Sequence, residues 1–188
     1  MKLALKISLL LNLLFVAAFF WLLRKYSDKF MQKLFPENAT ILILGDSILA
    51  QENWSKWLER LDISNQAYGG AITQQIRWNI GKGFPEKTKL VILNGGINDL
   101  FSGVPVEHIL ENYAFFIQQS KKQSIRLIIN SCIYTENQAE INQKVKVLNE
   151  GLLKLCNQEK ISFCDINSKL CENGFLLSVY STDGVHLQ

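Results

Sequence analysis

Short aliphatic runs alternate along the chain with longer segments in which apolar residues recur every three or four positions. The runs Ala39–Leu44, Lys89–Leu93 and Ile125–Ile129 are continuous, as expected for strands that are buried on both faces of a parallel sheet. Ile161–Ile166 has the same character, and Asp62–Gln66 is a weaker candidate. Each of these runs predicts one strand.

Apolar residues at helical spacing mark the segments between these strands. They form three stripes: Trp54, Trp57, Leu58 and Leu61; Ile109, Tyr113, Phe116 and Ile117; and Val145, Leu148, Leu152 and Leu155. The two tryptophans of the first stripe are expected in the core. Strands that alternate with helices of this length predict an α/β fold with right-handed crossovers, built as a three-layer α/β/α sandwich.

The N-terminal segment differs from the rest of the chain. Ile7–Leu23 carries no charged residue, and as a helix it would extend about 26 Å, close to the thickness of a bilayer core. We therefore expect residues 1–38 to form a transmembrane helix with a short linker, and residues 39–188 to form the second domain. Two alternatives remain open: a secretory signal cleaved after Val16-Ala17-Ala18, and a buried core helix.

Composition excludes one class of function. The formal net charge is only +3, and no stripe of Lys and Arg is interleaved with aromatic residues, so nucleic-acid binding is not expected. Four cysteines, Cys132, Cys156, Cys164 and Cys171, show no zinc-ligand spacing. Both disulfides and free thiols are compatible with them.

Polar and glycine-rich segments follow the predicted strands, where ligands of open parallel sheets bind. These segments are Gly45-Asp46-Ser47, Asn65–Gly70 and Gly96-Ile97-Asn98-Asp99, joined near the C-terminus by Asp183-Gly184-Val185-His186. Together they supply a hydroxyl, an imidazole, a carboxylate and amide donors. Acyl transfer needs these parts: a nucleophile, a base, a group that orients the base, and donors for an oxyanion.

The four segments resemble the sequence blocks of the SGNH, or GDSL, hydrolases, and the resemblance covers the chain from Thr40 to its end. It implies a flavodoxin-like sheet of about five parallel strands, a serine-ester mechanism, and no metal or cofactor. Ile48 stands where the family's motif has leucine, which is a conservative difference. Family members usually continue past the histidine into a further helix, whereas this sequence ends at Gln188. A naturally short domain and a truncated chain are both possible explanations.

The residues predict the following mechanism. Ser47 attacks an ester carbonyl, His186 moves the proton, and Asp183 orients the imidazole, since an i, i+3 spacing can place the last two side chains on one side of a turn. The backbone N–H groups of Ser47 and Gly70 and the amide of Asn98 form the oxyanion hole.

Structural explanations compete with these roles. Ser47 could instead cap the following helix, Gly69 and Gly70 could form only a tight turn, and Asp99 is expected to be structural. The other histidine, His108, looks like a residue in the first turn of a helix.

The expected substrate is a small-molecule or lipid acyl ester. Two alternatives are an O-acetyl esterase or acetyltransferase acting on envelope carbohydrate, and a non-catalytic, membrane-tethered binding module. The basic residues around the apolar segment slightly favour a cytoplasmic domain, whereas the family resemblance favours a single-pass protein with an extracytoplasmic domain.

Overall fold

The structure, a computed structural model, describes residues 11–21, 39–81 and 83–188. The chain divides into two units, Met1–Pro36 and Glu37–Gln188, and each is described here by itself.

Residues 11–21 of the first unit form a helix whose side chains are exposed. Among the described residues, no helix combines the length and the apolar character that crossing a bilayer requires. The predicted transmembrane helix, Ile7–Leu23, is therefore not supported by the structure. Residues 7–10 and 22–23 of that segment, and the predicted linker that follows, lie outside the described residues.

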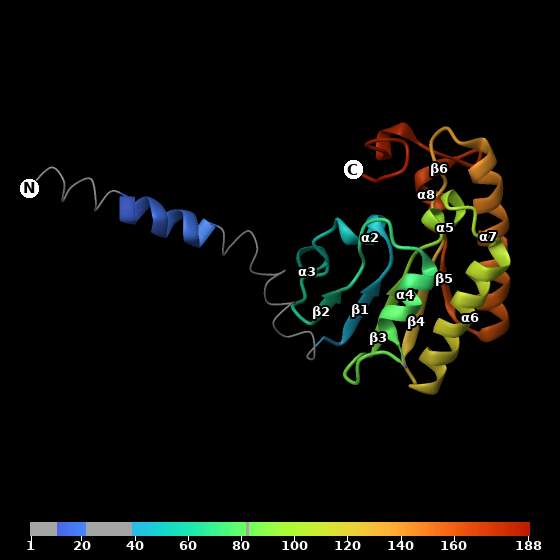
Figure 1. The fold of residues 1–188 in the computed structure, drawn as a ribbon, viewed down its shortest axis with the longest axis horizontal. Coiled ribbons are helices and arrows are strands. Elements are labelled where there is room, and N and C mark those ends of the chain that lie inside the picture. Colours follow the sequence, from blue (N-terminus) through green and yellow to red (C-terminus); the bar gives the residue numbers. More distant parts are fainter. Residues whose placement is uncertain (1–10, 22–38, 82) are drawn as a thin grey trace, which may run out of the picture. The chain divides into compact units, whose positions relative to one another are not determined.

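The second unit is built on a five-stranded sheet in the order β2-β1-β3-β4-β5, in which every neighbouring pair is parallel (Figure 1). This confirms the predicted α/β fold. The strands are β1 (Ile41–Leu44), β2 (Ile63–Asn65), β3 (Leu90–Leu93), β4 (Arg126–Asn130) and β5 (Ser162–Cys164). All five predicted strands are present. The strand order reverses between β1 and β3, so the carboxyl ends of these two strands flank the crevice where such folds bind ligands.

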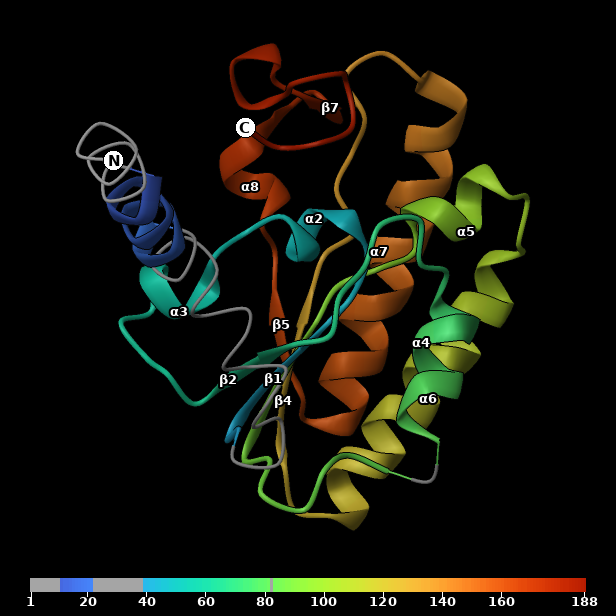
Figure 2. The same ribbon diagram turned by 60° about the vertical axis from the view of Figure 1, so that its left-hand side comes forward.

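The two faces of the sheet are covered unequally (Figure 2). On one face α4 (Thr73–Ile80), α6 (Val106–Lys122) and α7 (Ala139–Glu159) pack over the main hydrophobic core. The opposite face carries a smaller apolar cluster under the short helices α2 (Ser47–Ala50) and α3 (Trp54–Trp57). Alternate β1 side chains point to opposite faces, and all of them are buried.

Two of the three predicted helical stripes are confirmed. Ile109, Tyr113 and Phe116 of α6 are buried. Val145, Leu148 and Leu152 of α7 are buried in the same core, and Leu155 is half-buried against it. The first stripe is confirmed only at Trp54, which packs against the smaller apolar cluster. Trp57 is 68% exposed, and Leu61, 87% exposed, lies beyond the end of α3, where the helical period does not continue.

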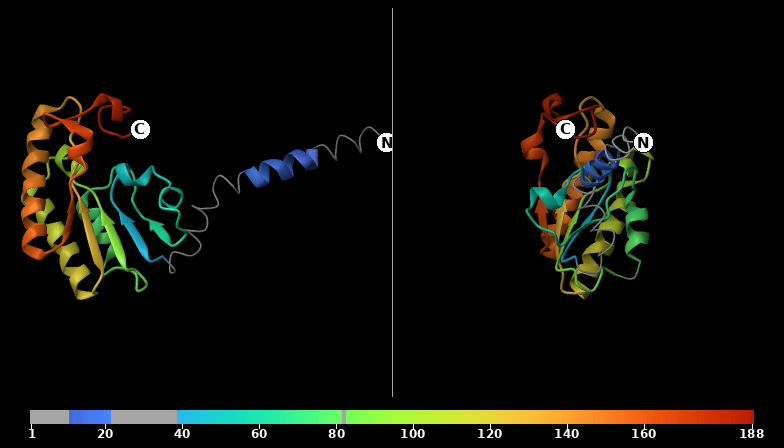
Figure 3. Two further views of the ribbon diagram at one scale, coloured as in Figure 1. Left: turned by 180° about the vertical axis from the view of Figure 1, so that it is seen from behind. Right: turned by 90° about the vertical axis from the view of Figure 1, so that its left-hand side faces the viewer.

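The C-terminal segment lies over the carboxyl edge of the sheet (Figure 3). It contains α8 (Asn167–Leu170), the antiparallel strands β6 (Cys171–Glu172) and β7 (Phe175–Leu176), and the short helix η2 (Ser178–Tyr180). Residues 181–188 then turn back on themselves, and Ser181 pairs with Leu187 in an isolated bridge.

All four cysteines are free thiols. Cys132 and Cys156 are buried, and burial raises the pKa of the Cys156 thiol to about 11. These two thiols serve as packing residues of the main core.

Candidate active site

The predicted nucleophile lies at a sharp strand-to-helix turn. β1 ends at Leu44, and α2 begins at Ser47, so only Gly45 and Asp46 separate them. A Cβ atom at Gly45 would stand 2.5 Å from the carbonyl oxygen of Asn94, which follows β3. Glycine is therefore required for the ends of β1 and β3 to approach this closely.

Asp46, and not Ser47, caps the short helix. Its Oδ1 accepts a hydrogen bond of 3.0 Å from the backbone N–H of Ile48. The capping alternative for Ser47 is thus wrong, and the Ser47 hydroxyl is available for another partner. Asp46 is fully buried, and its Oδ2 has no hydrogen-bond partner among the described residues. Burial raises the pKa of this carboxyl to about 6.

A continuous chain of polar contacts links the three predicted triad residues. The Oγ of Ser47 lies 2.9 Å from Nε2 of His186, and Nδ1 of the same ring lies 2.7 Å from Oδ2 of Asp183. The second oxygen of Asp183 accepts hydrogen bonds from the backbone N–H groups of His186 and Val185. Led by the backbone bond from His186, these contacts lower the pKa of Asp183 to about 2. Asp183 is therefore ionised at neutral pH.

The loop that carries the imidazole is closed by its own hydrogen bonds. The N–H of Thr182 donates to the carbonyl of His186 at 2.9 Å, and the N–H of Gly184 donates to the hydroxyl of Ser181 at 2.6 Å. One further bond of 2.9 Å joins the loop to the β4–α7 connection, from the N–H of Glu136 to the carbonyl of Gly184. This loop fixes Asp183 relative to His186.

A small apolar cluster holds the serine and the histidine together. Ile48, Ile133 and Leu176 are buried in it, and Leu187 packs against them. Ile48 follows the predicted nucleophile, and Leu187 follows the predicted base. The position that the family motif fills with leucine therefore has a packing role, and the isoleucine found here preserves it.

The two remaining predicted oxyanion donors lie on either side of β1. Gly70 occupies the turn after β2 and has φ +74°, a conformation that favours glycine. Asn98 lies in α5 (Ile97–Phe101), after β3, and one N–H of its amide donates to the carbonyl of Ala71 at 3.1 Å. A primary amide has two N–H donors, so a second one remains for a ligand. The N–H of Tyr68 donates to the carbonyl of Gly45 and ties this turn to β1.

Glycine is also needed in the third motif segment. Gly96 has φ +117°, and a Cβ atom there would stand 2.7 Å from a methyl carbon of Leu148 in α7. Asp99 is buried and accepts hydrogen bonds from Thr73, as expected for a structural residue. His108 lies in the first turn of α6, also as expected.

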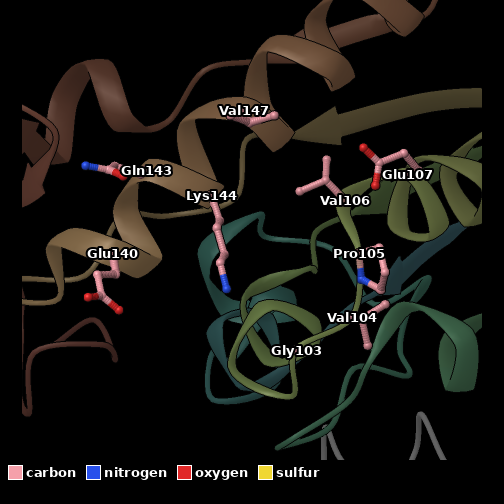
Figure 4. Close-up of a pocket in the computed structure, with 9 residues that line it drawn as sticks. All are labelled: Gly103, Val104, Pro105, Val106, Glu107, Glu140, Gln143, Lys144 and Val147. Atoms are coloured by element: carbon pink, nitrogen blue, oxygen red, sulfur yellow. The ribbon is translucent and has the colours of Figure 1, made fainter.

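A surface groove of about 480 Å³ lies elsewhere, between the connection after α5 and the first half of α7. In Figure 4 the Lys144 side chain extends across it from α7 towards Gly103. The lining residues include none of the predicted site residues. The groove is thus separate from the candidate active site.

A parallel α/β sheet with a serine, a histidine and a carboxylate aligned at its carboxyl edge is the framework of an ester-hydrolysing enzyme. The sequence profile of the GDSL-like Lipase/Acylhydrolase family matches residues 43–188, and the chain belongs to this family. The resemblance predicted from the motif segments is confirmed.

Solved structures show the same fold. A GDSL-like lipase from Bacteroides thetaiotaomicron superposes with a TM-score of 0.71 at 19% identity, covering 88% of each chain. An acetyl-xylooligosaccharide esterase from Geobacillus Stearmophilus superposes with a TM-score of 0.62 at 15% identity, covering 81% of this chain and 89% of the other.

Curated relatives are longer proteins. An N-acylneuraminate cytidylyltransferase from Streptococcus agalactiae serotype V is 25% identical over 155 residues, which is 82% of this chain but 36% of that protein. This chain therefore corresponds to only a part of the relative.

Proposed function

We propose that this chain is a serine esterase in which Ser47 is the nucleophile, His186 the general base and Asp183 the group that orients the imidazole. The observation that carries the proposal is the unbroken chain of contacts, 2.9 Å and 2.7 Å long, from the Ser47 hydroxyl to the Asp183 carboxylate. An ionised Asp183 favours the tautomer in which Nδ1 carries the proton, so Nε2 is free to accept the proton of Ser47.

The reaction follows from this geometry. Ser47 Oγ bonds to the ester carbonyl carbon as its proton passes to His186, and the carbonyl oxygen becomes an oxyanion. The backbone N–H groups of Ser47 and Gly70 and the free N–H of Asn98 stabilise that oxyanion. His186 then protonates the leaving alcohol, and a water molecule activated by the same imidazole releases the acid from the acyl-enzyme.

As substrate we propose a short acyl ester, an O-acetyl group above all, carried by a sugar. The side chains of His186 and Asp183 are 32% and 54% exposed, so the triad lies at the surface, where a bulky polar alcohol can be accommodated. The names of similar proteins support this choice. One is an esterase of acetylated xylooligosaccharide, and another acts on N-acylneuraminate, a sugar acid.

Hydrolysis of p-nitrophenyl acetate by the wild type and by Ser47→Ala tests the reaction. We expect the wild type to hydrolyse the ester and the variant to lose nearly all of the rate. A retained rate in Ser47→Ala would remove Ser47 from the mechanism.

A second assay tests the substrate class. Acetate release from acetylated monosaccharides and acetylated neuraminate is compared with hydrolysis of p-nitrophenyl esters of increasing acyl length. A sugar esterase should prefer the acetylated sugars and lose activity as the acyl chain lengthens. A preference for long chains would favour the lipid ester alternative, and transfer of acetyl to an added sugar would favour an acetyltransferase.

We also propose that the apolar segment Ile7–Leu23 tethers the protein to a membrane, with the catalytic domain on the extracytoplasmic side. Its described part, residues 11–21, is a helix with exposed apolar side chains. Extraction of membranes with alkaline carbonate should leave the full chain in the pellet and release a variant lacking residues 1–35. Protease accessibility in spheroplasts tests the orientation.

A further inference from the structure

A buried carboxylate links the two loops that carry the proposed oxyanion donors. Asp99 follows Asn98 in α5 and is 1% exposed. Its oxygens accept hydrogen bonds from the backbone N–H of Thr73, at 2.9 and 3.1 Å, and from the Thr73 hydroxyl, at 2.6 Å. Thr73 is the first residue of α4, and the preceding residue Ile72 offers no side-chain cap. Asp99 therefore caps α4 from a neighbouring helix.

The Thr73 hydroxyl is held in place by further contacts. Its oxygen accepts a hydrogen bond of 2.9 Å from the amide of Asn112 in α6, and that amide oxygen accepts one of 3.2 Å from Arg77. The guanidinium of Arg77 lies over the ring of Phe115, 4.4 Å from its centre. The contacts of Asp99 thus extend into the main helical layer and not into solvent.

Two parallel links connect α5 with the segment that contains Gly70. The amide of Asn98 donates to the carbonyl of Ala71, and the carboxylate of Asp99 accepts from Thr73. Gly70 itself is exposed, and a Cβ atom there would meet nothing within 4 Å. Its position therefore depends on bonds made by its neighbours rather than on packing of its own.

We propose that Asp99 and Thr73 are positioning residues that set the spacing between the N–H of Gly70 and the amide of Asn98, and so the fit of the oxyanion hole to the transition state. This inference rests on the proposed serine esterase function. Because donors must be placed to within a fraction of an ångström, a displacement of about 1 Å can reduce turnover about 100-fold.

Asp99→Asn tests the proposal. The asparagine keeps the shape of the side chain, but one of the two oxygens that accept hydrogen bonds from Thr73 is replaced by an NH₂ group, which can only donate. For p-nitrophenyl acetate we expect kcat to fall about 10- to 100-fold with little change in KM. The rate of labelling by a fluorophosphonate should fall in parallel, because its phosphoryl oxygen occupies the same hole. The pH midpoint of kcat/KM, which reports the imidazole, should stay at the wild-type value.

A double-mutant cycle separates positioning from general destabilisation. Asp99 is proposed to set the spacing between the N–H of Gly70 and the amide of Asn98. In an Asn98→Ala background that amide is already absent, so Asp99→Asn should reduce kcat by a smaller factor there than in the wild type. Gln123→Glu is the matched control. The Gln123 amide pairs with the N–H and the carbonyl of Phe84, before β3 and thus at the opposite end of the sheet, and its change should leave kcat unaltered.

Thr73 provides a second pair of variants in case Asp99→Asn fails to fold. Thr73→Val removes the hydroxyl and should lower kcat about tenfold. Thr73→Ser keeps the hydroxyl and should therefore keep most of the wild-type rate. Equal factors for Asp99→Asn in both backgrounds, or a fall in kcat matched by Gln123→Glu, would overturn the positioning role. Absence of both hydrolysis and labelling in the wild type would instead overturn the proposed function, and this inference with it.

Discussion

The two halves of the candidate active site are built in different ways. The oxyanion half comes from the ends of three adjacent strands, and its donors are linked through buried side chains to the main helical layer. The half that carries the imidazole and the carboxylate is a single loop, residues 181–188, with Asp183 more than half exposed. The first half is fixed by the core, whereas the second is fixed mainly by its own hydrogen bonds.

This difference shows which part of the site is held in position by few contacts, namely the C-terminal loop. Within the C-terminal loop, a hydrogen bond from the backbone N–H of His186 and a contact with its ring fix Asp183 against His186. The distance from that loop to Ser47 depends on one bond to the β4–α7 connection, on the packing of Val185 against the main core, and on the small cluster of Ile48, Ile133, Leu176 and Leu187. Changes in the oxyanion half should therefore act on transition-state stabilisation, and changes in the loop should act on proton transfer.

The largest effect is expected from the base itself. His186→Ala removes the acceptor of the Ser47 proton, and we expect kcat to fall about 10⁴- to 10⁶-fold. Asp183→Asn should reduce kcat less, because the imidazole is still present to accept the Ser47 proton although the amide no longer fixes its tautomer. Initial rates with p-nitrophenyl acetate measure both changes. A larger loss for Asp183→Asn than for His186→Ala would contradict the assignment.

The next effect concerns the oxyanion half. Asn98→Ala removes one donor, and we expect kcat to fall about 10²- to 10³-fold while KM changes little. The pH midpoint of kcat/KM should not move, since the imidazole is unaffected. A shift of that midpoint would mean that the two halves are not independent.

Asp46 lies beneath the nucleophile and should affect stability more than catalysis. Burial raises its pKa from 3.8 to about 6, so the folded protein binds this proton more tightly than the unfolded chain. The stability contributed by the protonated group is complete below pH 3.8, declines as pH rises towards 6, and is absent above it. Asp46→Asn keeps the helix cap without the charge.

Denaturant unfolding at several pH values tests this prediction. At pH 8 we expect Asp46→Asn to raise the free energy of unfolding by about 1–2 kcal/mol, and the gain should disappear near pH 4. A gain that is the same at both pH values would show that the ionisation of Asp46 is not responsible.

The smallest effect tests the cluster that joins the two halves. Leu187→Ala should loosen the loop against Ser47 and lower kcat about tenfold, with only a small loss of thermal stability. Val179→Ala is the matched control, since Val179 lies in the same segment but is 64% exposed. Equal activity of the two variants would show that the cluster does not hold the loop.

Much of the fold could be predicted because the strands are continuous aliphatic runs and the α6 and α7 stripes keep a helical period over several turns. The helix at Trp54–Leu61 could not, since spacing alone does not reveal that α3 ends after one turn. The site residues could be predicted where a polar or glycine-rich segment directly follows a predicted strand. The cap by Asp46 is a local contact with Ile48, two residues away, and Asp is a usual N-cap residue, so attention to Asp46 as well as Ser47 could have found it. The contact of Asp99 with Thr73, 26 residues apart in sequence, depends on tertiary packing and leaves no local signal.

The most direct test of the account is labelling of the full chain with a fluorophosphonate, followed by mass mapping of the adduct. We predict a single adduct on Ser47 in the wild type, none in Ser47→Ala, and strongly slowed labelling in His186→Ala. An unlabelled wild type would favour a binding module that lacks catalysis. An adduct that persists in Ser47→Ala would place the nucleophile elsewhere.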